Sequence, residues 1–313
     1  MNLIANEMMK IFKKTSTYIM IGLLIVIIIG IGGLSKYFEV KDGQTVESGD
    51  WKQALNAETE QMKADAAAIP QNASFFNKQI AINEYRLAND LPPPNETNTW
   101  VFLNDMISII DFIAIITITV AAGIVASEFS TGTIKLLLIR PVSRVKILLS
   151  KYVSVILFSV GMLLLSFFVL MLVGAVLFGF GDAGSYLAYV DGEVVERTQL
   201  GNALFMYAVS SIGLFMLTTM AFMVSAAFRN SSLAIGLSIF LLMAGVNLTY
   251  ILSMKFDWAK YSLFANISLM DYIDGEPLVE GMTLGFSVGV LVVYFLIFHL
   301  VSLLFFVKRD VRA

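Results

Sequence analysis

Long apolar runs alternate with polar segments along the whole chain. Six runs hold about 20 predominantly apolar residues each, the length an α-helix needs to cross a hydrocarbon core about 30 Å thick. These runs lie at about 17–34, 106–126, 152–179, 203–227, 232–252 and 283–307. The pattern therefore predicts an all-α, polytopic membrane protein with a single transmembrane domain over residues 1–313.

Composition agrees with this prediction. The chain is 58% hydrophobic and 14% charged, whereas soluble domains are roughly 45–50% apolar and about 25% charged. The first run follows Lys10, Lys13 and Lys14, an arrangement that signal peptides also show. No small-residue cleavage pattern follows it, and the run is long enough to span. We therefore expect an uncleaved first helix.

The charges separate onto the two sides of the predicted membrane. With six spans, both termini share one side with residues 127–151 and 228–231. The short segments on that side carry twelve Lys and Arg and three acidic residues, against nine and nineteen in the long segments opposite. Lys and Arg concentrate in short cytoplasmic loops. The pattern therefore predicts a multi-pass protein of the cell membrane with both termini in the cytoplasm.

The long segment 35–105 is predicted to form an external helical insertion. A helix near 50–68 has Asp50 as a candidate N-cap and is rich in good helix formers. A second helix is expected from about Ser74 to Asn89, because prolines 92–94 end it. We expect a small external helical cap, with a flexible polar loop as the alternative.

The external segment 253–282 differs in composition from the first. Trp258, Tyr261, Phe264 and Tyr272 are interleaved with charged residues. Aromatic side chains with polar tips favour the membrane interface. We expect a short helix lying at, or dipping into, the outer leaflet.

Residue counts exclude several kinds of site. The chain has no cysteine and one histidine, His299, so we expect no metal site; we expect His299 to form a hydrogen bond between helices rather than to relay protons. No Gly-Lys dipeptide occurs, so a P-loop is absent from the sequence. No nucleophile–base pair is visible either. We expect no enzymatic activity, no cofactor in this chain and no nucleic-acid partner.

The cytoplasmic segment after the second run contains a short apolar stretch. Gly132 can interrupt the preceding helix, and Thr131 or Thr133 can cap a new one. Residues 133–139 are then expected to form a short apolar helix that Pro141 ends. Such a helix needs a partner, either a groove on a soluble protein or the inner leaflet. From the residues alone both remain open.

This segment resembles the signature of ABC-2 type transporter permeases. Glu128 is followed by Gly132-Thr133, an apolar stretch, the run 140–144 (Arg-Pro-Val-Ser-Arg) and Lys151. The six spans and the basic cytoplasmic ends agree, and permeases of bacitracin- and lantibiotic-resistance and sodium-extrusion systems look most similar. The resemblance implies a coupling helix that docks on an ATP-binding subunit. The implied coupling residues are Glu128, Gly132, Thr133, Ile134, Leu137, Arg140, Pro141, Ser143 and Arg144.

The same resemblance implies the rest of an assembly. Two separate ATPase subunits would bind ATP and Mg²⁺, and a second permease chain, identical or related, would complete the pathway. The implied function is export of an amphipathic or lipid-like substrate, such as a peptide antibiotic, from a bacterial cell. The alternative is a sensor or scaffold that binds an external ligand and signals through the cytoplasmic helix. A secondary transporter would place several ionisable residues at mid-membrane, where this chain has few.

Two acids and three glycines in or near the spans are further candidates. Asp111 lies inside the second run and Asp105 at its outer end, so either can belong to a transport pathway. Solvation at the outer interface or a bond to another helix is the alternative. Gly281, Gly285 and Gly289 form a doubled G-x-x-x-G, which lets helices approach closely within a chain or in a dimer.

Overall fold

The structure is a computed structural model that describes most of the chain. The described residues are 3–42, 51–68, 73–93, 97–133, 142–181, 184–190, 192–228, 230–274, 277–279 and 281–307. Four of the predicted coupling residues lie outside these ranges. They are Ile134, Leu137, Arg140 and Pro141.

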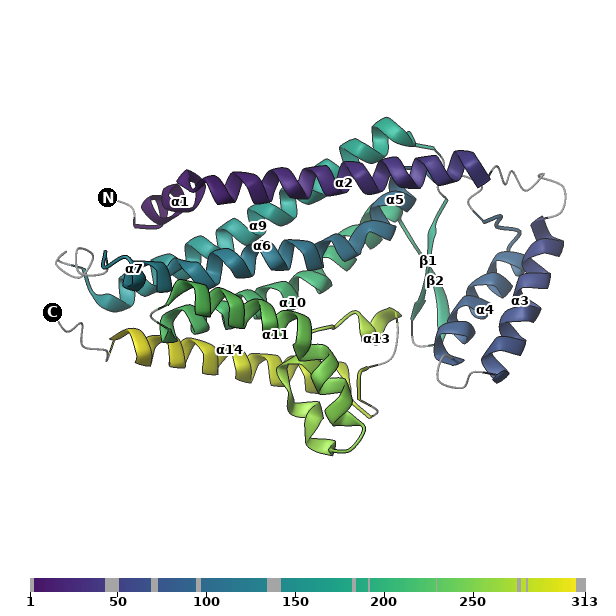
Figure 1. Cartoon of the computed structure of the whole chain (residues 1–313). Coiled ribbons are helices and arrows are strands. Elements are labelled where there is room, and N and C mark those ends of the chain that lie inside the picture. Colours follow the sequence, from purple (N-terminus) through teal and green to yellow (C-terminus); the bar gives the residue numbers. More distant parts are fainter. Residues whose placement is uncertain are drawn as a thin grey trace.

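Among the described residues, six helices are long and apolar enough to cross a membrane, which confirms the predicted fold class. They are α2 (Thr15–Asp42), the second span α5–η2–α6 (Thr99–Asp105, Met106–Ser108, Ile109–Ile124), α9 (Arg144–Leu177), α10 (Gln199–Ala227), α11 (Ser231–Ser253) and α14 (Leu284–Val307). The short helix α1 (Leu3–Lys13) and the last turn of α14 lie at one end of the bundle (Figure 1). Helix α4 (Ala73–Ala88) lies beyond the other end. These ends are called the α1 end and the α4 end.

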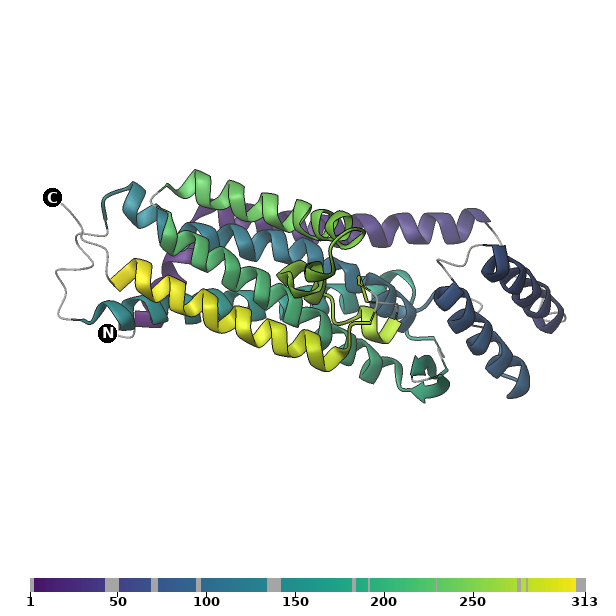
Figure 2. The ribbon, with the colours of Figure 1, turned by 90° about the horizontal axis from the view of Figure 1, so that it is seen from below.

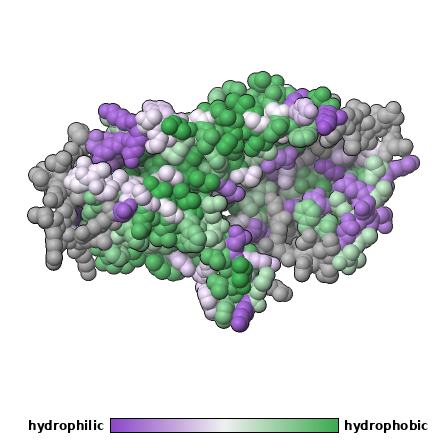
Figure 3. Space-filling model, viewed as in Figure 1, coloured by the Kyte–Doolittle hydropathy of each residue, from purple (hydrophilic) through white to green (hydrophobic). Residues whose placement is uncertain are grey.

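Helix α6 forms the centre of the bundle. It packs against α10, α11 and α9, and most of its side chains are buried. In contrast, α2, α11 and α14 bury only 22%, 17% and 22% of their most apolar windows. Figure 2 shows α11 and α14 on the same outer side of the bundle. The surface is hydrophobic along the middle of the bundle and more hydrophilic towards both ends, as expected for helices that face lipid (Figure 3).

Three spans extend farther than the apolar runs that predict them. Helix α2 continues past residue 34 to Asp42, the second span begins at Thr99 rather than 106, and α9 begins at Arg144 rather than 152. Hydropathy marks the part that lipid covers, whereas caps set where a helix begins. At the second span, the Asn98 side chain accepts hydrogen bonds from two backbone N–H groups, each at 3.0 Å.

Helix α9, with 34 residues, is the longest element of the chain's described part. At the α1 end, Arg144 Nη1 donates a hydrogen bond to the Val307 carbonyl, the last residue of α14, at 3.0 Å. Near the other end, Gly174 lies against α5, where a Cβ would come within 3.2 Å of the Thr99 Cα. A side chain here would have to push the α5 backbone away by a few tenths of an ångström, so glycine favours this close approach.

The α4 end carries a pair of helices and a hairpin. Helix α3 (Trp51–Ala68) packs beside α4, close to the two predicted ranges. Lys63 pairs with Glu84 at 3.1 Å and Lys52 with Asp90 at 2.6 Å, and these four side chains are 45–75% exposed. The ion pairs beside these two helices are therefore solvated.

The β-hairpin was not predicted. Strands β1 (Tyr186–Val190) and β2 (Glu193–Arg197) pair antiparallel, and Gly192 turns between them with φ +90°. The sequence signal is the Asp-Gly dipeptide at 191–192 between two β-branched and aromatic stretches. The hairpin contacts α4, where the Tyr85 hydroxyl donates to Glu196 at 3.2 Å.

Between α11 and α14 the chain forms the predicted short helical elements. They are η3 (Asp257–Tyr261), α12 (Leu263–Asn266) and α13 (Asp271–Asp274). Buried Asn266 ties this lobe to α14, because its Oδ1 accepts a hydrogen bond from Ser287 Oγ at 2.6 Å. Trp258 and Tyr261 are exposed on the lobe. Their location at a lipid interface stays a prediction.

Candidate functional site

The N-terminal helix α1 is separate from the first span and turns back against the bundle. The apolar pattern of residues 3–11 gives it one buried face, which holds Glu7 and Ile11. The buried Thr17 hydroxyl donates to the Ile11 carbonyl at 2.7 Å and fixes the corner between α1 and α2. Ser154 Oγ on α9 donates to the Ile4 carbonyl at 3.3 Å. These contacts hold Glu7 against α9.

The second span ends in a break that directs the next helix inward. Helix α6 ends at Ile124, and α7 (Ala126–Ser130) follows directly. Buried Ser225 on α10 accepts hydrogen bonds from the N–H groups of Val125 and Ala126 at 3.1 and 3.0 Å. A side-chain acceptor thus replaces the helical acceptors that these N–H groups lose at the break. The break places Glu128 on the buried side of α7.

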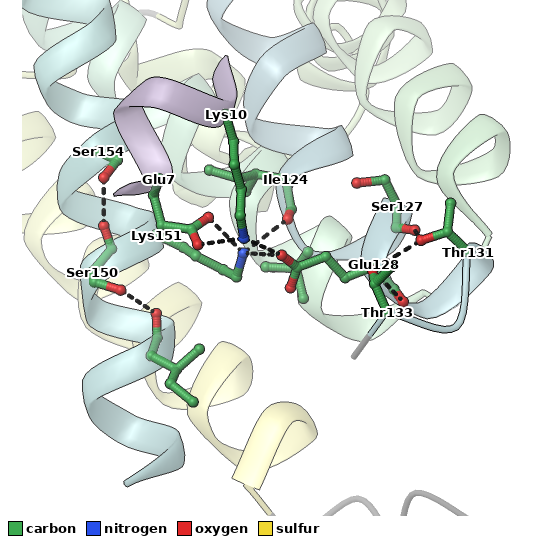
Figure 4. Close-up of polar contacts among 12 residues, drawn as sticks. Glu7, Lys10, Ile124, Ser127, Glu128, Thr131, Thr133, Ser150, Lys151 and Ser154 are labelled. Atoms are coloured by element: carbon green, nitrogen blue, oxygen red, sulfur yellow. Dashed lines mark hydrogen bonds and ion pairs between the residues drawn. The ribbon is translucent and has the colours of Figure 1, made fainter. Parts of the chain in front are cut away.

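Four charged side chains from three elements meet at this point (Figure 4). Lys151 Nζ lies 2.7 Å from Glu7 Oε2 and 2.7 Å from Glu128 Oε1. Lys10 Nζ lies 2.7 Å from Glu7 Oε1 and 3.0 Å from Glu128 Oε1. The cluster, defined as Glu7, Lys10, Glu128 and Lys151, joins α1, α7 and α9 with no net charge.

Three of the four residues of the cluster are buried, whereas the Lys10 side chain is 43% exposed. Lys151 is fully buried, and Glu7 and Glu128 are 4% and 8% exposed. Burial alone would raise the pKa of the Glu7 carboxyl, but the Lys151 and Lys10 ammonium groups outweigh it and hold the pKa below its ordinary value. For Lys10, burial lowers the pKa, but hydrogen bonds and attraction from Glu7 and Glu128 outweigh it and raise the pKa. The pairing therefore favours the charged forms of Glu7 and Lys10.

The cluster holds the chain on both sides of the predicted coupling segment, with Glu128 before the segment and Lys151 after it. After α7, Thr131 Oγ1 donates to the Ser127 carbonyl at 2.7 Å, and Gly132 adopts φ +73°. On the other side, Ser143 caps α9, accepting from the Lys146 N–H at 3.4 Å. Glu128 therefore anchors the chain that enters the segment, and Lys151 anchors the helix that leaves it.

The two pathway candidates lie away from the cluster. Asp105 ends α5, towards the α4 end, and Asp111 lies in the first turn of α6, near the middle of the second span. Both side chains are exposed, and neither forms an ion pair with a described residue. The structure does not bring them together with the coupling residues.

The three glycines do not form one helical stripe. Gly281 lies in a turn before α14, with φ +80°. A Cβ at Gly285 or Gly289 would meet no atom of the described chain within 4 Å. These two glycines therefore mediate no close helix approach within the described chain, and a dimer contact stays a prediction.

His299 bonds within its own helix. Its Nδ1 lies 2.9 Å from the Phe295 carbonyl, and its ring packs edge-on against Tyr152 of α9. The expected hydrogen bond between helices is therefore replaced by a ring contact. Among the described residues, no three His, Asp or Glu side chains gather as a metal site would need.

Sequence reasoning missed half of the cluster. Glu128 and Lys151 belong to the recognised pattern, but Glu7 and Lys10 do not. The available signal was weak: Glu7 is the single acid in a basic N-terminal segment and shares its helical face with Ile11. Nothing local pairs it with Lys151, which lies 144 positions along the chain.

Comparisons with known proteins place the chain in a family. A family model described as "Protein of unknown function (DUF2705)" matches residues 66–312. The chain belongs to this family. The matched region holds Glu128 and Lys151 of the cluster, whereas α1 lies outside it.

Two relatives from Bacillus subtilis (strain 168) are similar to the chain. The "Uncharacterized protein YhcI" is 42% identical over 314 residues, covering 99% of both chains. The "Uncharacterized membrane protein YdbK" is 34% identical over 200 residues, covering 63% of this chain and 77% of that protein. The six apolar helices and the similarity to a membrane protein agree on a multi-pass membrane protein.

Proposed function

We propose that this chain is the membrane-spanning subunit of an ATP-driven exporter, and that residues 133–143 dock on a separate ATPase in the cytoplasm. The observation that carries the proposal is the buried cluster. It fastens the residues on either side of this segment to each other and to α1, through Glu128 and Lys151. The resemblance of the segment to ABC-2 type permeases is the reason for proposing an ATPase as its partner.

The cluster suits the transmission of force. Separating Glu128 from Lys151 would remove an ion-pair partner from each of two buried charges, which is costly. Displacement of the docking segment is therefore expected to move α7, α9 and α1 together as one body. Rigid-body movement of this kind is a common form of switching between states.

The remaining parts of the proposal follow the charge pattern and the lipid-facing surface. The basic α1 end would be cytoplasmic, and six spans would form half of a pathway that a second permease chain completes. Two ATPases would bind ATP and Mg²⁺. The large apolar faces of α2, α11 and α14 favour an amphipathic or lipid-like substrate, including peptide antibiotics.

The test is affinity purification of the tagged chain in mild detergent from its own host. We expect an ATPase with a Walker A motif to copurify, and the chain alone to hydrolyse no ATP. The Leu137→Asp variant should lose the ATPase, because it places a charge in the apolar docking stretch. Lys146→Gln, with an exposed side chain outside this stretch, is the matched control. Turnover by the isolated chain, or unchanged copurification with Leu137→Asp, would contradict the proposal.

A second candidate function, an external sensor, is favoured by one observation. A cavity of about 240 Å³ lies between α4, β1 and the end of α5, and it is lined by Lys78, Arg86 and Asp105 among others. Charges of both signs suit a small zwitterionic ligand. Deleting the copurifying ATPase distinguishes the two functions. An exporter would lose the resistance to peptide antibiotics that it confers, whereas a sensor would keep its response to the external ligand.

A further inference from the structure

A cavity at the α1 end lies beside the cluster, and Glu7, Lys10 and Glu128 form part of its lining. Its volume is about 660 Å³, within the range of sites for small amphiphiles. Helices α1, α2, α6, α7 and α11 all contribute to its lining. The apolar part of the wall is formed by Ile11, Met20, Val120, Ile124 and Ile235.

The mouth of the cavity carries an excess of positive charge. Lys10 is neutralised within the cluster, but Lys13 and Lys14 also line the cavity and form no ion pair with a described residue. Both lysines are exposed. The hydroxyl-bearing residues Ser16 and Ser231 also line the cavity. Two free ammonium groups with nearby hydroxyls can bind one anionic headgroup.

The cavity extends from the junction of α1 and α2 along the ends of two spans, α2 and α6. Met20 lies five residues inside the start of α2, and Thr119 lies five residues before the end of α6. At about 1.5 Å per residue, the apolar wall reaches about 7 Å into each span. The lysines lie outside this depth, at the junction of α1 and α2. Charge and apolar surface are therefore arranged as they are in an anionic lipid.

We propose that this cavity binds an anionic phospholipid from the adjacent leaflet. The phosphate pairs with Lys13 and Lys14, and the acyl chains lie along the apolar wall between α2 and α11. A soluble anion would leave the apolar wall unfilled, and a neutral lipid would leave both ammonium groups without a partner. As a loading site for exported amphiphiles, the cavity rests on the proposed function. The binding itself does not, and it is measured without an ATPase.

The test measures lipid binding to the purified full chain in detergent by native mass spectrometry. The probes are phosphatidylglycerol, phosphatidylcholine, glycerol phosphate and inorganic phosphate. We expect phosphatidylglycerol to bind at least about tenfold more tightly than phosphatidylcholine. Each lysine near an anionic headgroup strengthens binding about fivefold, so Lys13→Gln with Lys14→Gln should weaken it about 25-fold. Lys146→Gln, an exposed cation outside the cavity at the same end, should leave it unchanged.

A second variant fills the cavity without changing charge. Val120→Trp occupies the apolar wall and should abolish tight binding, whereas Leu164→Trp, on the lipid-facing surface of α9, should not. Equal effects of the Lys146 and Lys13/Lys14 changes, or equal affinity for the two lipids, would overturn the proposal. Glycerol phosphate or inorganic phosphate binding as tightly as the lipid would overturn it too. If the lipid binds but no ATPase copurifies with the chain, only the proposed exporter function is contradicted.

Discussion

The two ends of the molecule use ion pairs in opposite ways. At the α1 end, the cluster buries Lys151 completely between two carboxylates from different helices. At the α4 end, Lys63 and Lys52 join neighbouring elements through side chains that stay largely in water. The bond lengths overlap, at 2.6–3.1 Å, so distance does not distinguish the two kinds of pair.

Burial is what separates them. Exposed pairs contribute little because water and salt screen them. A buried pair need not stabilise the fold relative to apolar packing, but removing one partner is costly because the other charge remains unpaired. The cluster therefore fixes how α1, α7 and α9 are placed relative to one another, whereas the pairs at the α4 end can open without changing the fold.

Replacing Lys151 with Met is expected to have the largest effect. Glu7 and Glu128 would then share only Lys10, and the free energy of unfolding should fall by about 3–5 kcal/mol. Chemical unfolding in detergent micelles measures this. Lys146→Met removes an exposed cation from the same helix and should change little. Equal losses in the two variants would show that burial does not decide the strength of these pairs.

Ser225→Ala is expected to have the next largest effect and tests the same end without changing charge. The buried N–H groups of Val125 and Ala126 would lose their acceptor, which should cost about 1–3 kcal/mol of unfolding free energy. Ser211→Ala, a partly exposed serine on the same helix that bonds within its own helix, is the control. A loss no greater than that of the control would mean that the break before α7 does not depend on Ser225.

Acidification should progressively lower the free energy of unfolding through Glu7 at the α1 end. The folded-state pKa of Glu7 lies below its ordinary value of 4.5, so its contribution is complete above that pH and is lost as the pH falls through the folded-state pKa. Between pH 5 and 3, the stability of Glu7→Gln should therefore fall less steeply than that of the native chain. Parallel pH profiles would show that Glu7 is not stabilised in its charged form.

Lys63→Met at the α4 end is expected to have the smallest effect. Its two partners, Glu60 and Glu84, are exposed and remain solvated when the ammonium group is removed. The midpoint of thermal unfolding should not move beyond experimental error, at low or at high salt. A clear, salt-dependent shift would show that the exposed pairs resemble the cluster more than their burial suggests.

Much of the fold follows from hydropathy. The six spans are predicted because about 20 apolar residues in sequence report on lipid directly. Hydropathy does not predict that the second span begins at Thr99 and α9 at Arg144, because these helix starts depend on side-chain caps rather than on lipid. The hairpin at 186–197 escapes prediction because strands of five residues are too short for a clear period.

The site is less predictable than the fold. Glu128 and Lys151 stand out because they fit a known pattern, but Glu7 acquires its partner only when α1 folds back against α9. A lone carboxylate on an amphipathic helix gives no sign of which distant cation it will meet. Asp111 stays a prediction: an acid within an apolar run suggests a special site, and its side chain is exposed near the middle of the second span, which runs from Thr99 to Ile124.

The length of α9 has a mechanical consequence. Its 34 residues extend about 51 Å, some 20 Å more than the hydrocarbon thickness. A stiff rod of that length works as a lever: a tilt of about 10° around Lys151 and its neighbours would sweep the tip at Leu177 sideways by several ångströms. Because Gly174 packs directly against Thr99, this sideways movement would displace the first turn of the second span.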